Sequence, residues 1–178
     1  MSQIRIQLGF TLIELMVTVS LMAIALTIAV PSYKAMIANN RSATEVNRFL
    51  TAINITRSEA VKRGIPVTLC ARKLPRTLPE SCSGDTDWST GLIMFSDNNG
   101  TKGVYDSASG DILLYVWDRP DGNPVITAGV SNIQYLPTGD TNKVAAFSYY
   151  FPGCKGNQKK TININLTGRA SISSTACG

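Results

Sequence analysis

The chain is 178 residues long, with 44% hydrophobic and 16% charged residues, which allows one core of ordinary domain size and argues against a multidomain enzyme. It contains no histidine, so Ser–His and Cys–His nucleophile pairs, histidine general bases and histidine metal ligands are all excluded. The formal net charge is +5, and both the charge and the hydrophobicity are unevenly distributed along the chain.

The first element is a single apolar run from Phe10 to Val30. Its 21 residues contain one charged side chain, Glu14, and about 20 apolar residues are enough to cross a bilayer as a helix. A secretory signal peptide would have a shorter apolar region, of roughly 7 to 15 residues, followed by an Ala-x-Ala-like cleavage site, which is missing here. A plain single-pass anchor explains everything except the carboxylate.

Glu14 needs a partner, because placing a charged side chain inside a membrane costs about 2.5 to 3.5 kcal/mol on insertion scales. No cation follows it within one helical turn, and Arg5 lies about two and a half turns back. We therefore expect the partner to be a positive group at the start of another subunit. Cleavage between Gly9 and Phe10 would create such a group, an amino terminus packed beside the acid.

The segment Gly9–Leu15, with the sequence GFTLIEL, resembles the class III signal of type IV pilins and type II secretion pseudopilins. Pro31 stands where such pilins carry a helix-bending proline. The resemblance implies cleavage by a prepilin peptidase after Gly9 and N-methylation of Phe10. It also implies that Glu14 pairs with the amino terminus of a neighbouring subunit during filament assembly.

The apolar run continues as an amphipathic helix that we expect to end at Arg63. Gly64 follows as a cap and Pro66 prevents the helix from resuming. The expected apolar stripe consists of Ala43, Val46, Phe49, Leu50, Ile53, Ala60 and Val61. The sequence thus divides into a leader (1–9), a membrane or filament-core helix (10–30), the amphipathic half of the same helix (31–64) and a head (65–178).

The head is predicted to be rich in β-strands, because short runs of β-branched and aromatic residues alternate with Gly, Pro, Asn and Asp. The tight Thr167-Gly168 connection predicts that the last two strands form a hairpin. The expected fold is α+β and pilin-like, a long N-terminal helix packed against an antiparallel β-rich head. The predicted strands are Ile65–Arg72, Gly91–Ser96, Asp111–Trp117, Asn132–Leu136, Val144–Phe151, Lys160–Leu166 and Arg169–Ser174.

Four cysteines lie in a region that a cleaved single-pass topology places outside the cytoplasm, where disulfides persist. Metal binding is the competing interpretation, but no pair has C-x-x-C spacing and no histidine is available to complete a site. Free buried thiols are a second alternative. Of the three possible connectivities, we favour Cys70–Cys82 with Cys154–Cys177, because each pair joins near neighbours that flank strands.

Charge is segregated within the head. Residues 77–140 contain nine acids and two cations, whereas residues 141–178 contain five cations and no acid. Such blocks are often ordinary solvated faces, and they also suit docking against different neighbours in a filament. A sharper interpretation is a phosphate-binding, and hence DNA-binding, surface. Its candidate residues are Lys155, Lys159, Lys160 and Arg169.

A second resemblance covers nearly the whole chain. The strings Arg57–Arg63 and Phe95–Gly100, and Gly168-Arg169 ahead of Cys177, are similar to the FimT/FimU/GspH family of minor pilins and minor pseudopilins. Members of that family serve as initiation and tip-complex subunits. Its DNA-uptake members carry a Gly-Arg-x-Arg pattern near the C-terminus, and here a serine, Ser171, replaces the second arginine.

These patterns predict a non-enzymatic minor pilin of the initiation or tip complex of a type IV pilus, with no cofactor and no metal. The alternatives are a DNA-binding minor pilin used in DNA uptake and a GspH-like minor pseudopilin of type II secretion. Expected partners are other minor pilins, the major pilin and the prepilin peptidase, with DNA as a further candidate. The expected location is the bacterial inner membrane, with the head in the periplasm, and later the extracellular pilus near its tip.

Overall fold

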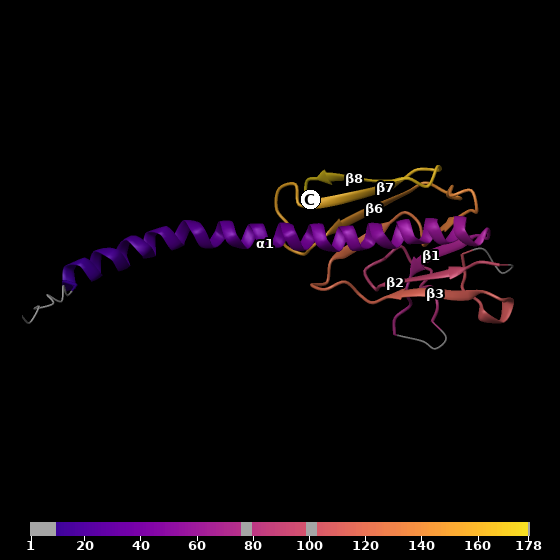
Figure 1. Ribbon diagram of the computed structural model, residues 1–178, viewed down its shortest axis with the longest axis horizontal. Coiled ribbons are helices and arrows are strands. Elements are labelled where there is room, and N and C mark those ends of the chain that lie inside the picture. Colours follow the sequence, from indigo (N-terminus) through magenta and orange to yellow (C-terminus); the bar gives the residue numbers. More distant parts are fainter. Residues whose placement is uncertain (1–9, 76–79, 99–102, 178) are drawn as a thin grey trace, which may run out of the picture. The chain divides into compact units, whose positions relative to one another are not determined.

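The computed structural model describes residues 10–75, 80–98 and 103–177, apart from the side chains of residues 34 and 35. Contacts divide the chain into two compact units, residues 1–41 and Ser42–Gly178. The helix α1, Leu12–Arg63, runs through both units, and all strands belong to the second (Figure 1). The second unit, called the head below, therefore includes the last turns of α1 from Ser42 onward.

Both ends of α1 are set by local chemistry. Thr11 caps the first turn, since its hydroxyl accepts a hydrogen bond from the amide of Glu14 at 3.3 Å. The helix therefore begins two residues later than Phe10, where the sequence pattern placed its start. At the other end Gly64 adopts a φ of 67°, and its amide donates to the carbonyl of Ala60 at 3.0 Å. The predicted glycine cap is confirmed.

Within the described residues, eight strands form two four-stranded sheets in which all neighbouring strands are antiparallel. The first sheet has the order β3-β2-β1-β5 and the second the order β4-β6-β7-β8. A short 3-10 helix, Ser107–Ser109, precedes β3. The strands are β1 Val67–Ala71, β2 Leu92–Ser96, β3 Ile112–Trp117, β4 Val125–Ala128, β5 Asn132–Tyr135, β6 Ala145–Tyr150, β7 Lys159–Ile164 and β8 Ala170–Thr175.

The main core lies between the head's part of α1 and the inner faces of both sheets. Phe49 from the helix packs edge-on against Phe147 of β6, and Phe147 packs edge-on against the fully buried Trp88. The predicted apolar stripe is correct at its centre and wrong at its margins. Ala43 and Val61 are exposed because they lie to the sides of the buried strip.

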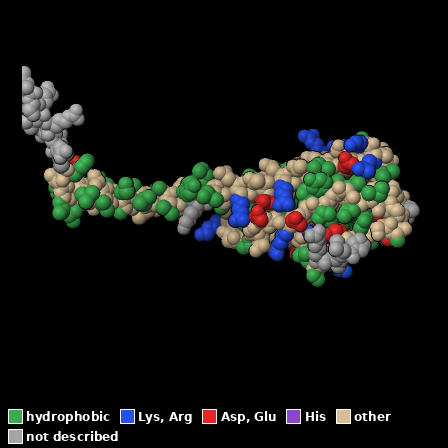
Figure 2. Space-filling view, turned by 60° about the horizontal axis from the view of Figure 1, so that its bottom comes forward, with side chains coloured by type: hydrophobic (Ala, Val, Ile, Leu, Met, Phe, Trp, Pro, Cys, Tyr) green, Lys and Arg blue, Asp and Glu red, His purple; other side chains and the backbone are tan. Residues whose placement is uncertain are grey.

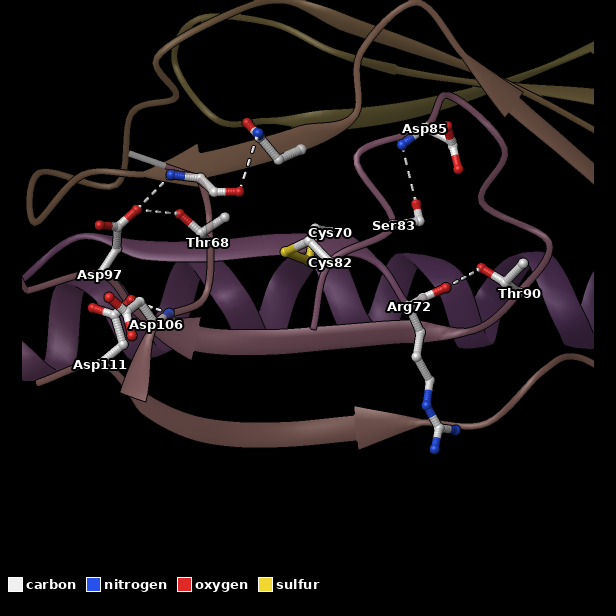
Figure 3. The surroundings of a disulfide bond; sticks show 12 residues. Thr68, Cys70, Arg72, Cys82, Ser83, Asp85, Thr90, Asp97, Asp106 and Asp111 are labelled. Carbon is white, nitrogen blue, oxygen red and sulfur yellow. Dashed lines mark hydrogen bonds between the residues drawn. A yellow bond between two sulfur atoms is a disulfide. The ribbon is translucent and has the colours of Figure 1, made fainter. Parts of the chain in front are cut away.

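A second, smaller core covers the outer face of the first sheet. Cys70, Ile93 and Phe95 are fully buried there, and Tyr105 packs against Phe95. The disulfide from Cys70 to Cys82 fastens the following loop over this face (Figure 3). Consequently every residue of β1 and β2 is buried, which explains why neither strand contains a charged residue.

The seven predicted strands coincide with observed strands to within two residues at each end, and β7 and β8 form the expected hairpin. The sequence analysis missed β4, a four-residue edge strand between Pro124 and Gly129. Its place is fixed by pairing with β6 and by two backbone hydrogen bonds with the loop that contains Thr86 and Trp88. The amide of Trp88 donates to the carbonyl of Ile126, and that of Ala128 donates to the carbonyl of Thr86.

Candidate functional site

The first candidate site is the start of α1. Thr11 and Glu14 are three residues apart, the spacing of a capping box, so the carboxylate lies in the first helical turn. An acid at this position is favoured by the partial positive charge of the helix N-terminus. Glu14 is exposed, and within the described residues no basic side chain forms an ion pair with it. Phe10 is also exposed, and the expected cleavage residue Gly9 lies outside the described residues.

The helix that follows presents apolar side chains on all sides. In the described part of the chain, α1 is the one helix long and apolar enough, by length and composition, to cross a membrane. Its hydroxyl groups are satisfied internally. Thr18, Ser20 and Thr27 each donate a hydrogen bond to a backbone carbonyl three or four residues earlier. Glu14 is therefore the main polar group of this segment whose transfer to an apolar environment costs free energy.

Pro31 lies inside α1, as its position in the sequence suggested. It has no amide hydrogen to donate to the preceding turn. Large apolar side chains on both sides of it, such as Ile28 and Met36, are exposed. The face shown in Figure 2 is accordingly dominated by hydrophobic side chains along the first unit, while charged side chains gather on the head.

The second candidate site is the predicted DNA-binding surface, and the second sheet separates two of its lysines. Lys159 and Lys160 are consecutive residues of β7, so their side chains leave opposite faces. The ammonium group of Lys159 lies 5.7 Å from the ring centroid of Tyr150 on the outer face. The ammonium group of Lys160 donates to the hydroxyl of Ser174 at 2.7 Å.

Arg169 lies at the far end of the same hairpin. Lys159 pairs with Thr175, whereas Arg169 directly follows the turn, one residue before Ala170 begins β8. Arg169 and Thr175 are six residues apart, which corresponds to about 20 Å at a rise of about 3.3 Å per residue. Lys155 lies at the Lys159 end, in the loop closed by the second disulfide, Cys154–Cys177. The structure does not bring the four predicted cations together. Both disulfides in the structure are the pairs favoured from the sequence.

Gly168 has a structural role that sequence reasoning did not identify. Its φ is 76°, and a Cβ at this position would overlap the carbonyl oxygen of Gly139 and come within 2.9 Å of the Tyr135 ring. The hydroxyl of Tyr135 donates to the carbonyl of Gly168 at 3.2 Å. The Gly168-Arg169 pair therefore belongs to a packed turn, in which the glycine permits close approach of two loops.

Arg57 of α1 joins this turn to the helix. Its Nε donates to the carbonyl of Gly139 at 2.9 Å, and its Nη2 donates to the carbonyl of Thr167 at 3.2 Å. A single guanidinium thus ties the loop after β5 and the turn after β7 to the same helical turn. The sequence contained a partial signal for this arrangement, because Arg57 and Gly168 both lie in the strings that carry the family resemblance.

A buried ion pair was also missed. Arg72 donates from Nε and Nη2 to the two carboxylate oxygens of Glu80, at 2.8 and 2.7 Å, and from Nη1 to Asp118 at 2.8 Å. These contacts fasten the loop that follows β1. Arg72 itself lies two residues after Cys70 of the first disulfide (Figure 3). Hydrogen bonding to Glu80 raises the pKa of Arg72, Asp118 adds to this effect, and burial opposes it.

Asp97 organises the opposite end of the first sheet. One of its carboxylate oxygens accepts hydrogen bonds from Thr68, Gln134 and the amide of Gly103. These donors come from three separate segments, so the acid has a structural role. Among the described residues no group of three or more His, Cys, Asp or Glu side chains is arranged to hold a metal ion.

Comparison with solved structures supports the fold assignment. The chain is similar to the type IV minor pilin FimU of Pseudomonas aeruginosa PAO1 in two crystal forms. For space group P65 the identity is 18%, the TM-score is 0.51, and the match covers 74% of this chain and 90% of FimU. For space group P21 the values are 17%, 0.55, 79% and 92%. At this identity the likeness shows the pilin-like α+β fold alone.

Two family models match the chain, one over its N-terminal segment and one over most of the head. The model described as "Type II transport protein GspH" matches residues 45–168, which include most of the head. The model described as "Prokaryotic N-terminal methylation motif" matches residues 4–30. A search of curated protein sequences gives no match. The chain therefore belongs to the GspH family of pilin and pseudopilin minor subunits, which are structural rather than enzymatic proteins, and it carries the prepilin methylation motif.

Proposed function

We propose that the chain is a minor pilin of a type IV pilus that acts in the initiation or tip complex. The observation that carries the proposal is Glu14, an exposed carboxylate in the first turn of α1 and the one charged side chain in the apolar segment 10–30. Such an acid is unfavourable in a membrane unless a positive group accompanies it. In a filament, that group is the amino terminus of the adjoining subunit.

The assembly mechanism follows from this pairing. A prepilin peptidase removes residues 1–9, and the new amino terminus at Phe10 is N-methylated. Residues 10–30 then pack among the equivalent helices of other subunits, which buries the exposed apolar side chains. The Glu14 pair sets the axial register, because a shift by one residue would separate two opposite charges in a medium of low dielectric constant. Residues 31–64 form the amphipathic half of the same helix, whose last turns, from Ser42 onward, belong to the head.

Location follows from the same features. The precursor spans the inner membrane once, with its head in the periplasm. Both disulfides of the head, Cys70–Cys82 and Cys154–Cys177, suit that oxidising compartment. After processing, the subunit enters the extracellular pilus near its tip, where its partners are other minor pilins and the major pilin.

Two alternative functions are supported to different degrees. A GspH-like pseudopilin of type II secretion shares the processing and packing steps, and the description of the matching family favours it. DNA uptake is less favoured, because the side chains of Lys159 and Lys160 leave opposite faces of β7 and Arg169 lies at the other end of the hairpin. The DNA-binding alternative predicts that the full chain in detergent binds duplex DNA with affinity that falls steeply between about 50 and 200 mM salt. Absence of binding at the lower concentration would exclude it.

The proposal is tested by Glu14→Gln, which removes the charge but keeps the shape. We expect normal processing, read by a mature mass that starts at Phe10, together with loss of the subunit from sheared filaments. Thr18→Val, one turn along the same helix, is the matched control and should be incorporated normally. Gly9→Leu should leave the chain beginning at Met1. Normal incorporation of the Glu14→Gln variant would contradict the proposal.

A further inference from the structure

The chain contains three Asn-x-Ser/Thr triplets, the acceptor pattern for a glycan on the side-chain nitrogen of asparagine. They begin at Asn40, Asn54 and Asn165. The first two lie inside α1, and the third lies in the turn between β7 and β8. Because the pattern is short, a triplet is an acceptor candidate only where its asparagine and its hydroxyl residue are exposed together.

The two triplets in α1 do not meet this condition. Residues two apart in a helix point in nearly opposite directions, because each turn contains about 3.6 residues. Asn54 is exposed, whereas Thr56 is fully buried and donates its hydroxyl to the carbonyl of Ala52 at 2.7 Å. In the first triplet Asn40 is exposed, but Ser42 is buried. Neither helical triplet therefore presents an asparagine and a hydroxyl on one side of the chain.

The triplet in the β7–β8 turn presents both groups. Asn165, Leu166 and Thr167 are all exposed, and the hydroxyl of Thr167 donates to Oδ1 of Asn165 at 2.8 Å. The backbone amide of Arg169 donates to the same oxygen at 2.9 Å, which fixes the orientation of the Asn165 side chain, because only its oxygen accepts a hydrogen bond. Nδ2, the atom that would carry a glycan, has no hydrogen-bond partner among the described residues.

The surroundings of this asparagine give a second, independent observation. Two large apolar side chains beside it are uncovered, since Leu166 is 56% exposed and Val144 is 61% exposed. Val144 directly precedes Ala145, which pairs with Ile164, so it lies across the end of the ladder from Asn165. A glycan on Nδ2 would shield both side chains from water, and uncovered neighbouring apolar groups are a feature of surfaces that carry a further ligand.

We propose that Asn165 is a glycosylation site, modified outside the cytoplasm from a glycan carried on a polyprenyl diphosphate. In the transfer, Nδ2 forms a bond to the anomeric carbon of the first sugar, and the bond from that carbon to the diphosphate oxygen breaks. The polyprenyl diphosphate leaves with the electron pair, and the proton lost from Nδ2 passes to a base of the transferase. This chain supplies the acceptor nitrogen and the neighbouring hydroxyl. The inference rests on the proposed function only for the position of the head outside the cytoplasm.

The test is the intact mass and the peptide map of the full chain isolated from the cells that produce it. The mature chain should be heavier than its sequence by a glycan, and the peptide that contains Asn165 should carry the added mass. Asn165→Asp is the most specific variant, because it keeps Oδ1 as acceptor for Thr167 and Arg169 and removes only the nitrogen. This variant should lose the added mass and still unfold cooperatively in urea.

The hydroxyl residue and a helical triplet supply the controls. Thr167→Val, which keeps the branched shape, should also lose the glycan, whereas Thr167→Ser should keep it. Asn54→Gln should leave the added mass unchanged. An unmodified Asn165 in the unaltered chain, a glycan on Asn40 or Asn54 instead, or added mass that survives Asn165→Asp or Thr167→Val would overturn the inference. The same spectra show whether the chain starts at Phe10, so an unmodified Asn165 leaves the proposed function standing.

Discussion

Replacing Arg72 by methionine should destabilise the head by about 3 to 5 kcal/mol, the usual cost of breaking a buried ion pair by removing one partner. The methionine keeps much of the aliphatic stem and removes the charge. Arg72 and Glu80 are 4% and 5% exposed, so the substitution leaves a carboxylate buried without its ion pair. Two charge-assisted hydrogen bonds, at 2.8 and 2.7 Å, are lost at the same time.

Removing the charge of Asp118, the other carboxylate bonded to Arg72, should have a much smaller effect. The side chain of Asp118 is 83% exposed, so its contact with Arg72 is largely screened by water and contributes about 1 kcal/mol at most. Asp118→Asn should therefore be nearly neutral. The double variant Arg72→Met with Glu80→Leu should recover most of the loss, because replacing a buried ion pair by apolar side chains is often neutral or stabilising.

Urea unfolding of the purified full chain, followed by tryptophan fluorescence, measures these differences. Both tryptophans, Trp88 and Trp117, belong to the head, and Trp88 is fully buried, so the signal reports on the unit that contains Arg72. If Arg72→Met lowers the free energy of unfolding by less than about 1 kcal/mol, the Arg72–Glu80 pair contributes no more than an exposed surface ion pair. A double variant as unstable as the single one would refute the argument from an uncompensated buried charge.

The same unfolding assay checks two further predictions. Gly168→Ala should lower the free energy of unfolding by more than the roughly 1 to 2 kcal/mol that a left-handed backbone costs alone, because the new Cβ would also overlap the carbonyl oxygen of Gly139. Gly153 has a φ of 80° but open space around its Cβ position, so Gly153→Ala should show only the backbone cost. Equal losses would contradict the packing argument. Burial raises the pKa of Tyr135 to about 12, so the folded state keeps a proton that the unfolded chain releases above pH 10. Stability should fall from pH 10 to 12, and Tyr135→Phe should remove that part of the decline.

Features that depend on near neighbours in the chain were predictable. The apolar run with Glu14, the glycine cap at Gly64 and the β7–β8 hairpin are all encoded within a few residues. Strands with a strong local composition were found for the same reason. Cysteine pairs 12 and 23 residues apart, such as Cys70–Cys82 and Cys154–Cys177, could be proposed from their proximity and flanking strands.

Other features were decided by contacts between distant segments. β4 is four residues long and is held by Trp88 and Thr86, about 40 residues earlier. Arg57 contacts carbonyls 82 and 110 residues away, and no local pattern specifies such partners. The four cations form one block in the sequence, yet strand alternation and hairpin length separate them in space. Sequence alone thus determined the apolar N-terminal segment and most elements, whereas the pairing of remote backbone groups decided which side chains share a surface.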